Sequence, residues 1–302
     1  MSILAVSEMG DPGAPRDKPR WSIILPYFNE EKFLAATLKG LMAQTLRPFQ
    51  LIVVDNASTD SSARVCREIL QEARDIRAVH LHEPRPGKTN ALELGLKHAD
   101  TEFVALCDAD TYYPPHYLDK CTSLYDASPS DLVAVMAVHQ MQEGTRLRKF
   151  LRQAKVVFRS YIYTKQCLTG GFGQTFRTSA LKSVGGFSAN IWPYVFEDHE
   201  IMQRLFKVGR SRYDFDLWCV PSERRNDRSR VDWTYWERRL YGILPFAFKD
   251  WYFYTFLARR FDARGLYQVR LREKTWQGEN AATSAVDLVP EIAPSAAAAE
   301  PR

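Results

Sequence analysis

The chain has 302 residues, of which 45% are hydrophobic and 25% are charged, and its formal net charge is +5. These proportions exclude a wholly disordered, collagen-like or coiled-coil chain, and the length allows one large domain or two ordinary ones. The five cysteines are widely spaced and include no Cys-x-x-Cys pair. This spacing argues against a disulfide framework or a zinc site and favours reduced thiols in a cytoplasmic protein.

Residues 1–20 are predicted to be a flexible N-terminal segment. They contain acidic residues and three prolines, and they lack the apolar run of a targeting signal. The most apolar stretch of the chain, residues 240–258, is interrupted by Pro245 and by Lys249-Asp250. A membrane-spanning helix needs about 20 mostly apolar residues. We therefore expect a soluble chain, or one that lies on a membrane surface.

The first half of the chain alternates short apolar runs with helix-like segments. The predicted strands are residues 21–25, 51–54, 78–81, 103–107 and 132–138, and the predicted helices are about 30–43, 60–73 and 88–98. Continuous apolar strands separated by helices predict a parallel sheet covered on both faces, which is a doubly wound α/β domain. Such sheets bind ligands at the carboxyl ends of their strands, where Pro26, Asp55 and Asp108 stand.

The second predicted strand ends at Asp55, which is followed by Asn-Ala-Ser-Thr-Asp60. Turn and helix-capping chemistry explains Ser58, Thr59 and Asp60. It explains Asp55 less well, because a carboxylate at the end of a strand can accept hydrogen bonds from a nucleobase or a ribose.

A Gly87-Lys88-Thr89 sequence begins the third predicted helix. It resembles a phosphate-binding Walker A loop, but His82 stands where that loop requires glycine, so ATP hydrolysis of that type is excluded. Two interpretations remain: Lys88 with the nearby Arg85 could neutralise a diphosphate at the helix N-terminus, or the segment is an ordinary basic helix start.

The sequence Cys107-Asp-Ala-Asp110 directly follows the fourth apolar run. Two carboxylates in a loop after a strand can both face one divalent cation. Mg²⁺ and Mn²⁺ prefer hard oxygen ligands, take few protein carboxylates and leave positions for phosphate oxygens. The alternative is a pair of solvated loop acids, since the motif is short, but the strand end favours a metal site.

Residues 145–165 are predicted to form a long helix with an apolar stripe and no acidic residue. Its cations are Arg146, Arg148, Lys149, Arg152, Lys155 and Arg159. The simpler interpretation is that the apolar stripe packs on the sheet while the cations are solvated. The alternative is an interfacial helix that makes peripheral contact with an anionic membrane.

Four titratable residues, Glu197-Asp-His-Glu200, stand at the start of another predicted helix. The helix dipole accounts for one or two acids in a first turn. If the site also holds a metal and a diphosphate, one of these carboxylates could be the general base toward a hydroxyl group. A metal-ligand role for His199 is not favoured, because no second histidine follows at the spacing that a helical metal site needs.

The C-terminal part of the chain has a different composition. Residues 233–261 contain twelve aromatic residues, and we expect a helical, aromatic-rich extension over residues 226–280. It is interpreted as a lid over an acceptor site or as a second membrane contact. Residues 281–302 are rich in Ala, Pro, Ser and Glu and are predicted to be a disordered tail.

Motifs in residues 21–220 resemble those of the large family 2 of glycosyltransferases, whose catalytic domain has the GT-A fold. Each motif alone is common, whereas the ordered series is specific, and it covers roughly two thirds of the chain. The motifs are Ile24–Glu30, Val53–Asp60, Pro86–Leu92, Asp108–Asp110, Gly170–Arg177, Val184–Phe187 and Glu197–Asp198.

The resemblance implies a Rossmann-like, doubly wound mixed sheet over residues 21–225 and an enzyme that uses a nucleotide-sugar donor. It implies roles for individual residues as follows: Pro26, Tyr27 and Glu30 around the nucleotide, Asp55 on the base or ribose, Lys88 beside the nucleotide or diphosphate, Asp108 on the ribose or the metal, Asp110 on a Mn²⁺ or Mg²⁺ ion, and Asp198, with Glu197 beside it, as catalytic base. The expected reaction is inverting transfer of a sugar to a hydroxyl of a glycan or lipid-linked acceptor. Such a reaction would serve cell-surface polysaccharide or glycolipid synthesis in the cytoplasm, at the inner face of the membrane.

Two features depart from the family's pattern. Many relatives carry Asp-Asp after the second strand, whereas this chain has Asp55-Asn56, which leaves nucleobase recognition open. The chain also lacks the Gln-x-x-Arg-Trp box and the membrane helices of processive polysaccharide synthases. We therefore expect addition of a single sugar.

Two other classes of protein are alternatives to this interpretation. One is a catalytically inactive regulator that binds a nucleotide sugar on the same fold, and the complete set of Asp108, Asp110 and Asp198 argues against it. The other is a nucleic-acid binder that uses the basic helix. No nucleic-acid-binding motif accompanies the charge, so no nucleic-acid partner is expected.

Overall fold

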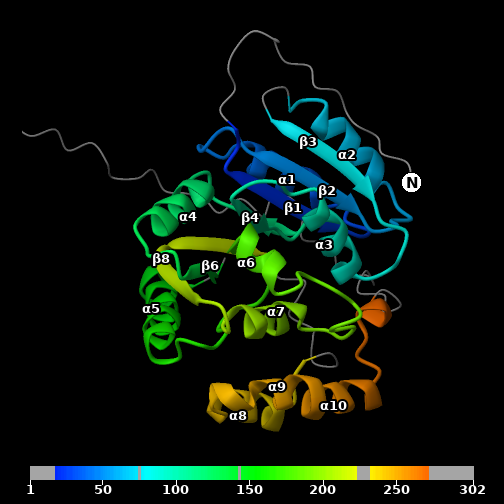
Figure 1. The fold of residues 1–302 in the computed structure, drawn as a ribbon. Helices are drawn as coiled ribbons and strands as arrows, with labels where there is room; N and C mark the ends of the chain where they lie inside the picture. The colour runs from blue at the N-terminus through cyan, green and yellow to red at the C-terminus, as the bar shows by residue number, and fades with distance from the viewer. Residues whose placement is uncertain (1–17, 74–75, 142–143, 223–231, 272–302) are drawn as a thin grey trace, which may run out of the picture.

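The computed structural model describes residues 18–73, 76–141, 144–222 and 232–271. The tail predicted at 281–302 and most of the N-terminal segment predicted at 1–20 lie outside the described residues. The described residues form a mixed eight-stranded sheet of order β3-β2-β1-β4-β7-β6-β8-β5 (Figure 1). The strands are β1 (Trp21–Tyr27), β2 (Gln50–Asp55), β3 (Arg77–His82), β4 (Phe103–Leu106), β5 (Thr111–Tyr112), β6 (Leu132–His139), β7 (Gln174–Arg177) and β8 (Arg210–Pro221).

The five predicted strands all form, and the sheet has the predicted mixed GT-A arrangement. Strands β3, β2, β1 and β4 are parallel neighbours, as their apolar runs predicted. Strand β7 then pairs antiparallel with both β4 and β6, and β5 pairs antiparallel with β8. The five predicted strands, β1–β4 and β6, therefore all run in the same direction, and the antiparallel members of the sheet, β5 and β7, were not among those predicted.

Helices cover both faces of the sheet, as Figure 1 shows. Their bounds are α1 (Leu34–Met42), α2 (Ser62–Leu70), α3 (Lys88–Lys97), α4 (Tyr117–Asp126), α5 (Arg146–Ile162), α6 (Thr178–Ser183) and α7 (Glu197–Leu205). Adjacent residues of β1 face opposite sides: Ile23 packs in the core with α1, α2 and α4, whereas Ile24 packs in the core with α3 and α7. A strand buried on both faces has no polar side, so its sequence reads as a continuous apolar run.

Helix α3 lies very close to β1, and Gly95 makes this approach possible. A Cβ atom added at Gly95 would lie 2.5 Å from Cγ2 of Ile24, closer than two carbon atoms can pack. The close packing fixes the N-terminus of α3, which carries Lys88, against the carboxyl end of β1.

The aromatic-rich extension forms a third hydrophobic core at the bottom of Figure 1, beneath α7. It comprises α8 (Tyr235–Ile243), a 3₁₀ turn (Phe246–Phe248), α9 (Lys249–Trp251), a π-helical turn (Tyr252–Leu257), α10 (Ala258–Ala263) and a last 3₁₀ turn (Gln268–Leu271). Trp192 of the first part of the chain inserts among Phe253, Tyr254 and Phe261 of the extension. Among the described residues, no helix is both long enough and apolar enough to cross a membrane.

Helix α5 does not pack as the simpler of its two interpretations predicted. Its apolar stripe does not pack on the sheet, because Leu147, Phe158 and Tyr161 are 66%, 66% and 71% exposed. Val157 is the buried residue of this helix. The less exposed side of the helix carries Gln153, Val156, Val157 and Ser160, and this mixture of polar and apolar side chains does not form a recognisable apolar stripe.

Candidate active site

A narrow cavity opens where the carboxyl ends of β1 and β4 meet the N-termini of α3 and α7. Its free volume is about 10 Å³. Five of the predicted site residues line it: Pro26, Lys88, Asp108, Glu197 and Asp198. These residues come from four separate segments of the chain, and they meet because parallel strands end at one edge of a sheet.

Lys88 is the cation at the centre of this cavity. Its Nζ atom lies 2.6 Å from Oδ1 of Asp108 and 3.6 Å from Oε1 of Glu197. The Lys88 side chain keeps 37% of its exposure, whereas the two carboxylates are nearly buried. One ammonium group thus links the strand-end carboxylate to the carboxylate of α7.

Asp198 and Glu197 occupy the first turn of α7. Oδ1 of Asp198 accepts hydrogen bonds from the backbone N–H of His199, at 2.9 Å, and from Nδ1 of the His199 ring, at 3.0 Å. Burial acts to raise the pKa of Asp198, but the interactions with His199 and Lys88 outweigh it and hold the pKa below its usual range. Burial and the charge of Asp198 raise the pKa of Glu197 against the opposing effect of Lys88. Asp198 is therefore the more readily ionised of the two.

Glycines leave room for the Asp198 carboxylate. A Cβ atom added at Gly171 would lie 3.1 Å from Cβ and 3.3 Å from Oδ2 of Asp198, and one added at Gly170 would lie 3.7 Å from Oδ2. Gly171 and Gln174 also line the cavity. The Gly170–Arg177 motif thus forms the wall beside Asp198 and continues into β7.

Aromatic side chains of the extension hold His199. Its ring makes edge contacts with Trp233 and Tyr241, at centroid distances of 5.1 and 5.8 Å, and with Phe196 at 5.8 Å. The Tyr241 hydroxyl accepts a hydrogen bond from the backbone N–H of Cys167 at 3.1 Å. The extension therefore fixes the imidazole that donates to Asp198.

Glu200, the last of the four titratable residues at the start of α7, has a structural role. It forms a buried bidentate ion pair with Arg204 at 2.7 and 2.8 Å, and the Tyr254 hydroxyl also donates to it. Arg204 also donates to the backbone carbonyls of Val184 and Gly186. This pair connects α7 to the Val184–Phe187 motif and explains why the two motifs occur together.

The two aspartates proposed as metal ligands lie in different surroundings. Asp108 lines the cavity, whereas Asp110 does not and is 1% exposed. Oδ2 of Asp110 accepts a hydrogen bond from the Ser222 hydroxyl at 2.9 Å. Among the described residues, no group of three His, Cys, Asp or Glu side chains is placed to hold a metal. The hard oxygen donors of this pair fit Mn²⁺ or Mg²⁺ only if donor phosphate oxygens complete the coordination shell.

The other residues predicted around the nucleotide, Tyr27, Glu30 and Asp55, lie at or just after the ends of β1 and β2, outside the lining of this cavity. Oδ1 of Asp55 accepts from the backbone N–H of Ser58 at 3.0 Å, and its Oδ2 lies 3.1 Å from Nδ1 of His82. The Tyr27 hydroxyl is buried and lies 2.8 Å from Nε2 of His80, and burial raises its pKa. Glu30 begins the turn that leads into α1, where its carbonyl accepts from the N–H of Leu34.

The structure explains why asparagine follows Asp55. The Asn56 amide group donates to the carbonyls of Glu83 and Arg85, at 3.1 and 2.8 Å, and its oxygen accepts from the N–H of Gly87 at 3.0 Å. A carboxylate cannot donate, so aspartate would lose two of these bonds. Asn56 thus shapes the loop that leads to Lys88, and its side chain is engaged in that loop.

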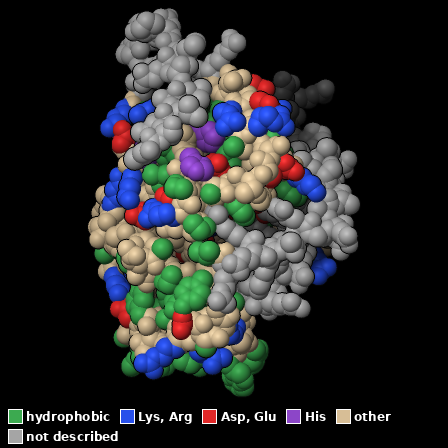
Figure 2. All heavy atoms as spheres, turned by 90° about the vertical axis from the view of Figure 1, so that its right-hand side faces the viewer, with side chains coloured by type: hydrophobic (Ala, Val, Ile, Leu, Met, Phe, Trp, Pro, Cys, Tyr) green, Lys and Arg blue, Asp and Glu red, His purple; other side chains and the backbone are tan. Residues whose placement is uncertain are grey.

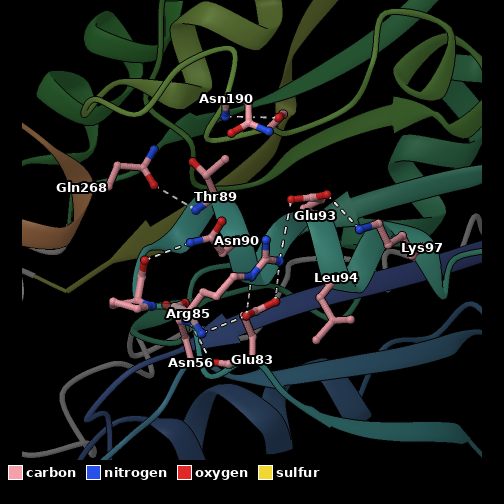
Figure 3. Close-up of polar contacts among 12 residues, drawn as sticks. Asn56, Glu83, Arg85, Thr89, Asn90, Glu93, Leu94, Lys97, Asn190 and Gln268 are labelled. Atoms are coloured by element: carbon pink, nitrogen blue, oxygen red, sulfur yellow. Dashed lines mark hydrogen bonds and ion pairs between the residues drawn. The ribbon is translucent and has the colours of Figure 1, made fainter. Parts of the chain in front are cut away.

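Arg85 does not join Lys88 in the cavity. Figure 3 shows its guanidinium group between Glu83 and Glu93, with Nη2 of Arg85 2.8 Å from Oε2 of Glu83 and 3.8 Å from Oε2 of Glu93. The interpretation of Arg85 as a diphosphate partner is therefore not supported. Lys88 is the cation of this loop that reaches the cavity.

Gln268 is a residue of the site region that the sequence did not reveal. Its Oε1 accepts from the backbone N–H of Thr89 at 2.9 Å (Figure 3), and its Nε2 donates to the Tyr194 carbonyl at 2.9 Å. Nε2 also lies 3.4 Å from Oε2 of Glu197. The end of the extension thus joins the start of α3 to the start of α7. A single glutamine in a mixed segment gives no periodic or motif signal.

Comparisons with known proteins agree with this architecture. The model of the family described as Glycosyl transferase family 2 matches residues 22–185. An uncharacterised glycosyltransferase of Nostoc is 30% identical over 115 residues, which are 38% of this chain and 35% of that protein. The chain thus matches about a third of the length of this curated relative.

Two solved structures share the fold. The mannosyltransferase PcManGT of Pyrobaculum calidifontis, in complex with GDP-Man and Mn²⁺, has a TM-score of 0.61 and 26% identity, covering 72% of this chain and 62% of that one. TarS (residues 1–349) of Staphylococcus aureus, in complex with UDP-GlcNAc, has a TM-score of 0.53 and 21% identity, covering 80% of this chain and 73% of that one.

Proposed function

The chain belongs to glycosyl transferase family 2, and on this basis we propose that it transfers one sugar from a nucleotide-sugar donor to an acceptor hydroxyl, with inversion at the anomeric carbon. One observation carries the proposal. Asp198 and the Lys88–Asp108 pair line the same cavity, so a proton acceptor and a site for a diphosphate stand together. An in-line displacement needs a base for the attacking hydroxyl and a group that binds the leaving diphosphate, and both are present here.

On the donor side, the Lys88 ammonium group binds the diphosphate and stabilises the negative charge that it gains as the anomeric C–O bond breaks. Because Lys88 is now paired with Asp108 at 2.6 Å and the cavity is narrow, donor binding requires Lys88 to move from this carboxylate to the phosphates. Asp108 and Asp110 would hold a Mn²⁺ or Mg²⁺ ion, which supplies Lewis-acid stabilisation of the leaving group when bound. The structure of PcManGT in complex with GDP-Man and Mn²⁺ supports a divalent cation at the donor site.

On the acceptor side, Asp198 removes the proton from the attacking hydroxyl. Its lowered pKa keeps it ionised at neutral pH, and His199 fixes the orientation of the carboxylate through Oδ1. The second oxygen, Oδ2, lies beside Gly170 and Gly171 and is left to face the acceptor. Glu197 binds Lys88 and supports its position.

The remaining nucleotide contacts are assigned to Pro26, Tyr27, Glu30 and Asp55 at the ends of β1 and β2. We assign a glycan or lipid-linked acceptor and a role in cell-surface polysaccharide or glycolipid synthesis. We further place the enzyme in the cytoplasm, at the inner face of the membrane.

The experiment is a donor screen followed by product analysis. Melting temperatures are measured with UDP- and GDP-sugars, with and without Mn²⁺, because a ligand that binds only the native state raises the melting temperature. The donor that gives the largest shift is then incubated with acceptor candidates, and NMR of the product reports the anomeric configuration.

We expect a metal-dependent shift and an inverted product. Retention of configuration would contradict the assignment of Asp198 as base in a single displacement. Donor binding without any transfer or hydrolysis would instead identify a nucleotide-sugar-binding regulator.

A further inference from the structure

Helix α5 exposes a broad apolar face, at one edge of which the Phe150 ring stacks on Phe215 of β8 at a centroid distance of 5.6 Å. Leu147, Phe150, Leu151, Phe158, Tyr161 and Ile162 are all between 55% and 71% exposed. At 100° per residue these side chains fall on one arc of the helix, and the buried Val157 lies just beyond the edge of this arc, next to Phe150. A contiguous apolar surface of this kind on a soluble domain usually marks an interaction site.

Beside the apolar arc, α5 carries an arc of cationic side chains, and a surface cavity lies next to them. A surface cavity of about 460 Å³ is lined by Arg152, Lys155 and Arg159 together with Leu151, Val156 and Leu168. The helix contains no acidic residue to neutralise these cations. The cavity therefore offers positive charge and aliphatic surface to the same occupant.

The C-terminal end of α5 adjoins the aromatic extension. The Lys165 ammonium group lies 4.6 Å from the ring centroid of Phe246, and the Gln166 amide donates to the Tyr241 carbonyl. Nearby, α8 exposes Trp236, at 75%, and Tyr235. Figure 2 shows hydrophobic side chains interspersed with Lys and Arg at the bottom of the molecule, where Figure 1 places α8–α10. Trp and Tyr beside cations are typical of surfaces at the membrane–water boundary.

We propose that the exposed face of α5 is a docking surface for an anionic lipid bilayer, with headgroup phosphates bound between Arg152, Lys155 and Arg159. The apolar arc enters the boundary between headgroups and acyl chains, and the cations contact the charged leaflet. This proposal rests on the proposed function, because it specifies how the enzyme reaches the membrane. Vesicle binding is measured without sugar transfer, so the docking surface and the transfer reaction can be contradicted separately.

Charge complementarity favours a bilayer over other occupants. A second copy of the chain, bound symmetrically through the same face, would bring the cationic arcs of two acid-free helices together. A nucleic acid would pair with the cations but would leave Leu147, Phe158 and Tyr161 without an apolar partner. A lipid surface supplies both anionic headgroups and apolar volume.

The test is co-sedimentation of the full chain with vesicles of phosphatidylcholine alone and of phosphatidylcholine mixed with phosphatidylglycerol. The charge variant is R152Q/K155Q/R159Q. Each cation near an anionic leaflet contributes about fivefold in partitioning, so we expect about a hundredfold loss with the mixed vesicles. The apolar variant L147S/F158S/Y161S is also expected to lose binding.

The matched control is K39Q/R64Q/R67Q, which removes three charges from exposed positions on α1 and α2, far from α5 in Figure 1. It should bind the mixed vesicles nearly as the unaltered chain does. Melting temperatures check that all variants fold, which is expected because the altered side chains are exposed.

Three outcomes would overturn the proposal. The unaltered chain could stay in the supernatant at low salt, or the control could lose as much binding as the charge variant. Release from vesicles by inorganic phosphate at constant ionic strength would show a site for free phosphate in place of a bilayer surface.

Discussion

The strand-end side of the cavity and the α7 side are held in place by different kinds of contact. Pro26 lies near the end of β1 and Asp108 follows β4, and a backbone hydrogen-bond ladder fixes the positions of these two strands. Glu197 and Asp198 belong to a helix that starts after Phe196, whose φ of 63° is left-handed, and that contacts the extension through His199 and Glu200. Pro26 and Asp108 therefore depend on the sheet, whereas the base side depends on distant parts of the chain. Changes in the extension should alter turnover more than donor binding.

The largest effect is expected for Asp198→Asn, which removes the proton acceptor and keeps the shape of the side chain. Loss of a general base lowers turnover by about 10²- to 10⁴-fold. The donor Kd, measured by titration, should change little, because Asp198 is on the other side of the cavity. Asp216→Asn, an exposed aspartate of β8, is the control. Full activity of D198N would remove Asp198 from the mechanism.

The donor side is tested by Lys88→Met, which keeps the length of the side chain and removes its charge. Loss of a group that stabilises developing charge costs about 2.7–4 kcal/mol, or about 10²- to 10³-fold in turnover. Donor affinity should also fall, unlike in D198N. Arg85→Met is the matched control from the same loop, since its guanidinium group contacts Glu83 and Glu93. Equal losses of turnover and donor affinity in K88M and R85M would contradict the conclusion that Lys88, and not Arg85, acts in the cavity.

The extension is tested by Glu237→Gln. Glu237 is fully buried and pairs with Arg260 and Arg264 at 2.6 and 2.9 Å. Because both arginines reach water, we expect a loss of about 2–3 kcal/mol in the free energy of unfolding, less than for a fully buried pair. Turnover should fall with the stability of the extension, while donor affinity is retained.

The same residue gives a pH prediction. Burial acts to raise the pKa of Glu237, but the bonds from Arg260 and Thr234 and the charge of Arg264 lower it overall. A lowered carboxyl pKa stabilises the fold above the ordinary glutamate value of about 4.3, and this contribution is lost as the pH falls through the folded-state pKa. The difference in melting temperature between the unaltered chain and E237Q should therefore shrink at acid pH. A constant difference would contradict the ion-pair explanation.

The smallest effect is expected for Gln268→Ala, which removes the bridge between α3 and α7. The lost hydrogen bonds to Thr89 and Tyr194 are worth about 1 kcal/mol each, so turnover should fall about fivefold to thirtyfold. Val269→Ala, at an exposed neighbouring position, is the control. No change in turnover in Q268A would show that the extension acts on α7 through its other contacts, such as those with His199 and Glu200.

Much of the first half of the fold could be predicted because its strands are buried on both faces and read as apolar runs. Strand β8 was not found, since its first half (Arg210–Asp216) is charged and its pairing with β6 is interrupted by irregularities. Helix α4 does carry a sequence signal, since Tyr117, Leu118, Cys121, Leu124 and Tyr125 are buried at helical spacing. The long helix α5 was found, but the side of it that packs was not.

The sequence by itself determined which strand ends carry Pro26 and Asp108, where Lys88 begins α3, and that two acids begin α7. These features follow from local patterns, since burial sets the apolar runs and polar side chains follow where the strands end. Only the tertiary structure decided that Asn56 shapes the Lys88 loop, that Gln268 bridges the two helices, and that α5 presents its apolar face to solvent. These facts depend on contacts between residues far apart in the chain, and no local period or spacing records such contacts.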